Sequence, residues 1–558
     1  MAAVVGVEGF MRSYLCFFLF LLFVYSEAPL ARAEEELHNE IQRITERGGA
    51  SLLKLRAHGY DAKTIDRTLH SFYRERSFAP NWIEHNVPSS RAEKLRQIIL
   101  AANLDGLTPE DYFIGPLNAR WDRQDVTSRA ELDILLTLAC GRFAADAREG
   151  RIEAHDIDRK LFGAVRPERP DLKKIIGEVL NSSDIAVALR EQFPNHRQYE
   201  RLRSALADYQ KIAAAGGWTA IDQGPPLTLG SSGTRVAALV RRLEITADMP
   251  GTKTPVDTYS DQVADAVRRF QQRHGIPASG QVDARTLTAL NVPVTERIKA
   301  IAINLERWRW LQRDFSEGKE VLVNIAGYEL FAENSGDMAL RLPVIVGKAY
   351  HATPVFSDRI RWVEVNPYWN VPPSIAANEM LPKLKRDPNY LAKQHMRLYD
   401  ARADSRRQLS PASINWRKVT RAQMQRYAIR QDPGAWNALG KLKFVFPNSY
   451  NVYLHDTSAP ELFAKQERLF SHGCIRVSSP DQLAAFLLNS PNEPWTVDRV
   501  NEYITSGKNQ VVKLPTPVRV HLTYRTAWVD RDGTVQFRPD VYGRDAKIAA
   551  VMFQTKSN

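Results

Sequence analysis

Cysteine is scarce in this chain, and so are long apolar runs. Three cysteines among 558 residues exclude a fold stapled by disulfides. The one conspicuous apolar run covers 12 residues, Tyr14 to Tyr25, whereas a membrane-spanning helix needs about 20. Apolar residues make up 44% of the chain and charged residues 25%, which excludes a mostly disordered or collagen-like protein.

Size and charge narrow the classes that remain. A length of 558 residues favours about two to four domains. Lysine and arginine number 76 against 64 aspartates and glutamates, a net charge of +12. A basic surface suits an anionic partner, such as nucleic acid, anionic lipid or an acidic wall polymer.

The N-terminus predicts export. Arg12 precedes the apolar run and Ala31-Arg32-Ala33 follows it, the layout of a secretory signal peptide. We therefore expect a signal peptide over residues 1–33, cleaved after Ala33, and a periplasmic mature protein. An uncleaved anchor is the weaker alternative. Met11 would give a more regular start than Met1.

Two helical regions follow. Apolar residues recur at helical spacing over residues 34–222, which predicts a helical scaffold domain without visible chemistry. Cys140 lies in its most apolar stretch and is expected to be an inert buried thiol. Residues 226–292 read as three short helices around one small core.

From residue 294 to 558 the pattern favours strands. Short β-branched segments bounded by Gly, Asn and Asp recur at 321–325, 342–346, 362–365, 444–446 and 518–522. Between about 374 and 438 they give way to polar and helical sequence, interpreted as a helical insertion into this β-rich domain. The predicted fold class is multidomain α+β, with a sandwich-like β-rich catalytic domain.

The chemistry concentrates in two segments, Tyr453–Thr457 and Ser471–Arg476. Cys474 lies 19 residues after His455 and directly after Gly473. A cysteine nucleophile needs its thiolate form, and a neighbouring imidazole is the usual activator. Glycine before the cysteine lets a substrate approach the backbone and frees N–H groups for an oxyanion. The pattern predicts nucleophilic catalysis by Cys474 with His455 as its base.

Two other interpretations of the cluster are weaker. A zinc site could use His455, His472 and Cys474, but the chain has no CxxC or HExxH spacing. A papain-like wall amidase has its cysteine upstream of the histidine, whereas His455 precedes Cys474.

The segment from His455 to Arg476 resembles the L,D-transpeptidases of the bacterial cell wall. Their pattern is a histidine followed, one loop later, by Ser/Thr-His-Gly-Cys-x-Asn/Arg, and here 15 residues separate His455 from Ser471. Residues 226–292 also resemble the peptidoglycan-binding module of wall enzymes. Four further segments look like the large Gram-negative branch, which joins a helical scaffold, that module and a capped catalytic domain: 72–82, 366–388, 430–457 and 526–545.

The resemblance implies a set of roles. Cys474 would be the nucleophile and His455 the general acid/base, oriented by a main-chain carbonyl near Asp456. Oxyanion and substrate binding would fall to Tyr453, Ser471, His472, Gly473 and Arg476, with the N–H groups of Gly473 and Cys474 around the oxyanion. Arg476 would contact a carboxylate of the substrate. The competing interpretation is that Arg476 forms a structural ion pair within the protein.

The resemblance also implies partners. Peptidoglycan stem peptides would be donor and acceptor, carbapenem-type β-lactams would inhibit, and membrane-associated wall-synthesis proteins are further candidates. No metal, organic cofactor or nucleic acid is implied. Two alternatives stay open: a hydrolase that resolves the thioester with water, and a non-catalytic wall-binding scaffold. The acceptor could be a stem peptide, an outer-membrane protein or water, depending on how the insertion closes the site.

Overall fold

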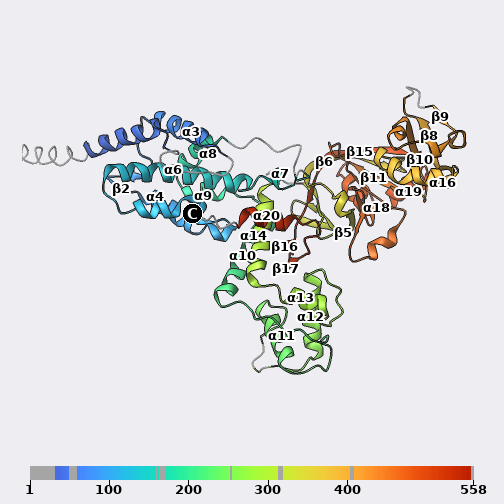
Figure 1. Ribbon diagram of the computed structural model, residues 1–558, viewed down its shortest axis with the longest axis horizontal. Helices are drawn as coiled ribbons and strands as arrows, with labels where there is room; N and C mark the ends of the chain where they lie inside the picture. Colours follow the sequence, from blue (N-terminus) through green and yellow to red (C-terminus); the bar gives the residue numbers. More distant parts are fainter. Residues whose placement is uncertain are drawn as a thin grey trace, which may run out of the picture.

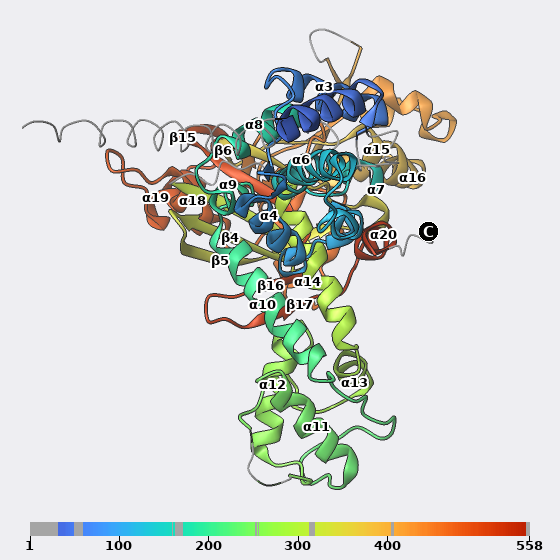
Figure 2. The same ribbon diagram turned by 90° about the vertical axis from the view of Figure 1, so that its left-hand side faces the viewer.

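The computed structural model describes residues 32–49, 60–158, 160–161, 171–251, 254, 256–311, 318–402 and 407–553. Residues 1–31 of the predicted signal peptide lie outside the described residues, and residues 32–46 are helical. Within the described part, no helix combines the length and the apolar character needed to cross a membrane. The helical N-terminal domain, the β-rich C-terminal domain and its insertion follow one another along the longest axis, and a small module projects to the side (Figures 1 and 2).

The N-terminal domain is a helical assembly around one long buried helix, α6. Its elements are α3 (Ala62–Arg74), β1 (Ile83–Glu84), β2 (Val87–Pro88), α4 (Ser90–Leu100), η1 (Ala102–Asp105), η2 (Pro109–Tyr112), α5 (Ile114–Arg120), α6 (Val126–Glu149), α7 (Ala154–Ile157), α8 (Leu172–Leu180), α9 (Ile185–Arg190) and α10 (Arg197–Ala214). Asp125 begins α6 by accepting the N–H of Ser128, an N-cap that satisfies one free donor of the first turn. Cys140 on α6 is fully buried.

The projecting module and the helix after it connect this domain to the sheet. The module packs α11 (Thr234–Ile245), α12 (Asp261–Arg273) and α13 (Ala284–Leu290) around its own apolar core. The next helix, α14 (Val294–Arg309), occupies a region where strands were expected. It places Leu305 in the core of the N-terminal domain and Ile303 in that of the sheet, so one helix joins both cores.

The C-terminal domain is built on a sheet of strand order β13-β5-β14-β12-β11-β6-β15-β3-β4. β4 also pairs with β5, so the sheet closes on itself where a sandwich was expected. Its β-rich character, predicted from β-branched segments, is confirmed. The strands are β3 (Lys319–Asn324), β4 (Glu329–Asn334), β5 (Asp337–Gly347), β6 (Phe356–Val365), β11 (Leu442–Val445), β12 (Leu454–His455), β13 (Leu469–Ser471), β14 (Ile475–Val477) and β15 (Gln510–Thr523).

Shorter elements complete the domain. They are η3 (Ala349–His351), η8 (Pro460–Ala464), α18 (Pro480–Leu488), α19 (Val497–Thr505), the hairpin β16 (Ala527–Val529) with β17 (Val535–Phe537), and α20 (Arg544–Met552). Helix α18 packs against β15, β11 and β5 and covers part of the sheet.

The insertion, here called the cap, combines the predicted helical segments with a small sheet that was not predicted. It contains a sheet of order β7-β10-β8-β9, formed by β7 (Trp369–Asn370), β8 (Met396–Asp400), β9 (Gln408–Leu409) and β10 (Tyr427–Gln431). Its helical elements are α15 (Pro373–Ile375), η4 (Ala376–Met380), α16 (Leu381–Arg386), α17 (Tyr390–Lys393), η5 (Pro411–Ser413), η6 (Trp416–Lys418) and η7 (Ala422–Arg426). In β8 the buried Met396 and Leu398 flank the exposed Arg397, which is the alternation typical of a strand. The strand was not predicted because this alternation is short and lies within a basic stretch of sequence.

Candidate active site

The two predicted catalytic residues lie on neighbouring strands. His455 ends β12, and Cys474 directly precedes β14. The strands pair in parallel, with Leu454 opposite Ile475, and the N–H of Ile475 donates to the carbonyl of Tyr453 at 3.1 Å. This pairing brings two segments that are separated by a loop into one site.

A row of ionisable residues crosses the sheet through His455. Glu364 on β6 is the register partner of Lys443 on β11, Lys443 that of His455, and His455 that of Arg476 on β14. Register partners lie on the same face of a sheet, so these four side chains form one row. Lys443 Nζ is 3.6 Å from Glu364 and 4.5 Å from the ring centroid of Tyr453. The imidazole therefore has a cationic residue on either side.

His455 is a neutral base at physiological pH. It is 5% exposed, and burial, together with the charges of Arg476 and Lys443, lowers its pKa to about 3. The nearby main chain of Asp456 and Leu439 opposes this shift. Among the described residues no group has standard hydrogen-bond geometry to Nδ1 of His455, so its orientation by a carbonyl near Asp456 stays a prediction.

Cys474 is a neutral thiol in the same surroundings. Burial raises its pKa, while hydrogen bonding with Tyr453 and two nearby cations lowers it. The thiol donates to the carbonyl of Asn451 over 3.9 Å, a long sulfur contact. The ring of Tyr453 meets that of His455 edge-on, with 5.6 Å between centroids. Thiol and imidazole thus rest as an uncharged pair beside a phenol.

The turn before Cys474 is tied internally by Ser471. The Ser471 hydroxyl donates to the carbonyl of Cys474 at 2.5 Å and accepts the N–H of Gly473 at 3.1 Å. Gly473 has φ +118°, a conformation that a side chain would strain. Because the N–H of Gly473 donates to Ser471 while no acceptor faces the N–H of Cys474 in the described residues, the latter is the freer donor for an oxyanion. The oxyanion roles of both groups stay predictions.

Thr353, which sequence reasoning missed, supports this turn from outside the motif. It is fully buried; its hydroxyl donates to the carbonyl of Gly473 at 3.0 Å and accepts the N–H of Gly347 at 2.9 Å. Tyr542 donates to the carbonyl of Gly347 at 2.6 Å and accepts the N–H of Thr353 at 3.3 Å. No local pattern singles out Thr353, because its partners are distant in sequence.

His472 and Asp456, two further residues predicted for the site, have partners other than His455 and Cys474. Nε2 of His472 is in contact with Glu379 of the cap, and its ring lies 5.0 Å from that of His351. Asp456 accepts the N–H of Lys441 at 2.8 Å and so holds the turn into β11. Glu379 was also missed, since it lies far away in the insertion.

Comparison with known proteins matches three parts of the chain. Residues 318–520 match the family of the L,D-transpeptidase catalytic domain. This part of the chain is similar to the L,D-transpeptidase catalytic domain. Residues 67–206 match a scaffold domain family, and residues 232–290 a family named "Putative peptidoglycan binding domain". The matched ranges lie within the predicted domains, whose boundaries stay predictions.

Individual relatives carry the same names. A protein of Haemophilus influenzae named "Putative L,D-transpeptidase" is 37% identical over 248 residues, 44% of this chain and 48% of that protein, so the match spans about half of the relative's length. An L,D-transpeptidase structure from Xylanimonas cellulosilytica has 16% identity, a TM-score of 0.18 and coverage of 54% and 98% of the two chains. An L,D-transpeptidase structure from Stackebrandtia nassauensis has 17% identity and a TM-score of 0.22, and the match covers 56% of this chain and 98% of that chain.

Arg476 offers the site an anion-binding group. Within the described residues no carboxylate lies within ion-pair distance of its guanidinium, and its Nε is buried without a hydrogen-bond partner. Burial lowers its pKa, while Cys474 and Glu461 raise it. A guanidinium in this position is suited to bind a carboxylate beside the nucleophile.

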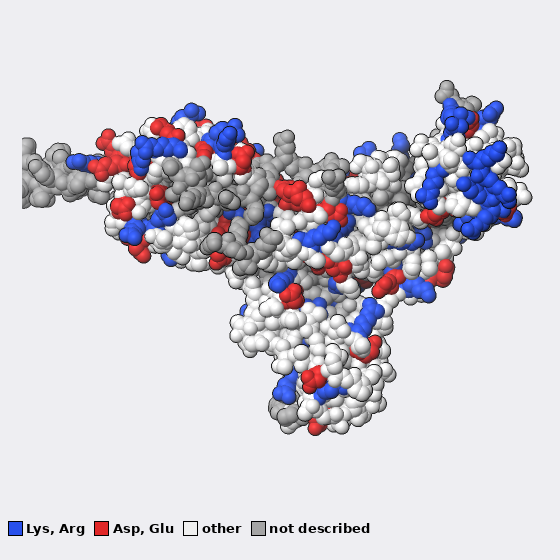
Figure 3. Space-filling view, viewed as in Figure 1, with Lys and Arg blue, Asp and Glu red and all other residues white. Residues whose placement is uncertain are grey.

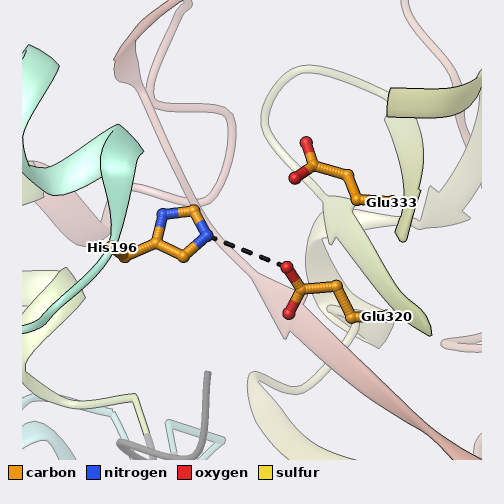
Figure 4. A group of neighbouring side chains, drawn as sticks. All are labelled: His196, Glu320 and Glu333. Carbon is orange, nitrogen blue, oxygen red and sulfur yellow. Dashed lines mark ion pairs between the residues drawn. The ribbon is translucent and has the colours of Figure 1, made fainter. Parts of the chain in front are cut away.

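A second polar cluster lies between the N-terminal domain and the sheet, where His196, Glu320 and Glu333 face one another (Figure 4). Nε2 of His196 is 3.8 Å from Glu320, and one ligand atom from each residue lies within 4.8 Å of the others. Nδ1 of His196 accepts the N–H of Gln198, so Nε2 carries the proton and faces the carboxylate as a donor. Arg525 also lies close to both glutamates. The cluster is therefore a polar contact between the N-terminal domain and the sheet, and a metal would have to displace this proton.

Proposed function

We propose that the protein is a periplasmic L,D-transpeptidase that forms 3→3 cross-links between peptidoglycan stems through a thioester on Cys474. The observation that carries the proposal is the pairing of β12 with β14, which brings a buried neutral imidazole and a thiol to one side of the sheet. The match of residues 318–520 supports the reaction class.

In the first step Cys474 attacks the carbonyl of the L-centre of meso-diaminopimelate in a tetrapeptide stem. His455 takes the thiol proton as the sulfur–carbon bond forms, because an imidazolium standing beside Arg476 and Lys443 would be unfavourable at rest. The N–H of Cys474 and the phenol of Tyr453 are the donors suited to stabilise the oxyanion. The carbon–nitrogen bond then breaks, and D-Ala leaves with the proton from His455.

In the second step the side-chain amine of diaminopimelate on another stem attacks the thioester. His455 accepts a proton from the amine as the new amide bond forms, the carbon–sulfur bond breaks, and the departing thiolate of Cys474 takes that proton from His455. Arg476 is suited to hold a carboxylate of the bound stem, since no protein carboxylate neutralises it within the described residues.

Incubation of the purified protein with tetrapeptide muropeptides tests the proposal. Mass spectrometry should detect cross-linked dimers that have lost one D-Ala, and Cys474→Ala should abolish them. A tripeptide product without dimers would instead indicate hydrolysis, and unchanged substrate with intact wild-type protein would contradict catalysis on these stems.

A further inference from the structure

The cap carries an unusual excess of exposed cations. Figure 3 shows lysines and arginines gathered over the cap end of the molecule, with few acidic residues between them. Among the described residues, the exposed cations of the cap without a carboxylate within ion-pair distance, here called the basic face, are Lys383, Lys385, Arg386, Arg407, Arg417, Lys418, Arg421 and Arg426.

The acidic residues of the cap do not neutralise this face. Asp387 pairs with Lys393, Asp400 with Arg402 and Asp432 with Arg397, while Glu379 contacts His472 outside the cap. The described cap thus has no remaining acid for the basic face, whose charge is available to a partner.

The basic face adjoins the active site. Helix α16, with Lys383, packs against η6, which ends at Lys418. The turn η4 precedes α16, packs against η7 and supplies Glu379, which contacts the loop that holds Cys474. Through η4, the elements that carry the basic face are therefore packed next to the segment that precedes Cys474.

We propose that the basic face binds the carboxylates of a peptidoglycan strand, the one that presents the acceptor stem to the thioester. This inference rests on the proposed function and names the surface that holds the second substrate. Arginines predominate on the face, and their planar fork matches carboxylates. Several stems on one strand would engage several cations at once, which raises the overall affinity without a deep pocket.

A membrane is the less suitable occupant. Within the described cap the one exposed large apolar side chain is Trp436, at the end of the insertion, and its ring stacks on that of His395 with 3.8 Å between centroids. A surface that inserts into the headgroup region usually carries apolar side chains among its cations.

Co-sedimentation with insoluble peptidoglycan tests the inference in the full chain, carried out in a Cys474→Ala background so that no turnover occurs. The test variant combines Arg417→Gln, Lys418→Gln, Arg421→Gln and Arg426→Gln. Its control combines Lys63→Gln, Arg67→Gln, Arg74→Gln and Arg123→Gln, exposed cations of the N-terminal domain that give the same change in charge. If the test variant melts at a lower temperature, Lys383→Gln, Lys385→Gln and Arg386→Gln replace it.

We expect about tenfold weaker binding for the test variant and a weaker dependence on salt, as for the loss of several exposed ion pairs. The control should bind like the parent. On peptidoglycan whose carboxylates have been amidated, parent and test variant should bind alike. Co-sedimentation with phosphatidylglycerol vesicles is measured in parallel. Equal binding of parent and test variant to native peptidoglycan would overturn the inference, and so would a loss of binding that is seen only with the vesicles. Failure of the wild type to cross-link would refute the proposed function and leave this binding result standing.

Discussion

Glu379 of the cap contacts Nε2 of His472, two residues before Cys474 in the chain. Glu379 lies in η4, a single π-helical turn of the kind often found at functional sites. This contact links an insertion with its own apolar core to the loop that positions the thiol. Four predictions follow from this and the neighbouring contacts.

Glu379→Gln should impair cross-linking more than acylation. The side chains of this pair are partly exposed, so its loss should weaken the reaction with muropeptides by about fivefold at most. Acylation by a small carbapenem should stay within about twofold, because a β-lactam needs little of the cap. Asp387→Asn, which removes another paired acid of the cap, is the matched control and should change neither rate. Equal losses in both assays would argue against a role of the cap in substrate binding.

Cys474→Ala should abolish covalent capture of a carbapenem, and Cys140→Ala should leave it unchanged. Burial raises the pKa of Cys140 to about 12 and no solvent reaches it, so it cannot act as a nucleophile. Intact-protein mass spectrometry measures the adduct. A folded Cys140→Ala protein without an adduct would refute the assignment of Cys474.

Acylation should be nearly independent of pH between about pH 5 and pH 8, because neither partner titrates there. The lowered pKa of His455, about 3, keeps the imidazole unprotonated as pH falls, and the raised pKa of Cys474 keeps the thiol neutral as pH rises. His455→Ala should slow acylation by about 10²–10⁴, the usual contribution of a positioned base. Stopped-flow measurement of carbapenem acylation gives both results. A rate that drops steeply below pH 7 would show that the base titrates near its ordinary value.

Thr353→Val should destabilise the catalytic domain and slow acylation. Valine has the same shape but leaves the N–H of Gly347 and the carbonyl of Gly473 unpaired inside the protein, a cost of about 1–3 kcal/mol. Chemical denaturation and acylation kinetics measure the two effects. Thr353→Ser keeps the hydroxyl and should retain most of the acylation rate. If valine and serine behave alike, the hydroxyl does not support the turn.

Much of the architecture is already predictable from local pattern. Apolar periodicity and β-branched runs predicted the helical domain, the helices of the module and the strands around His455, since these signals need only neighbouring residues. The cap sheet and α14 escaped prediction for the same reason. The strands of the cap are short and basic, and the buried surface of α14 is shared between two cores that only the folded chain brings together.

By itself, the sequence determined which residue types could perform the chemistry. They are a cysteine that follows a glycine, a histidine one loop before that cysteine, and an arginine two positions after it. Only the tertiary structure decided their state. Burial next to Lys443 and Arg476 keeps the imidazole of His455 neutral, and the hydroxyl of Ser471 accepts the N–H of Gly473. Thr353 and Glu379 reach the loop from other parts of the fold. Charge, burial and hydrogen-bond partners depend on distances in space, and a linear pattern does not contain them.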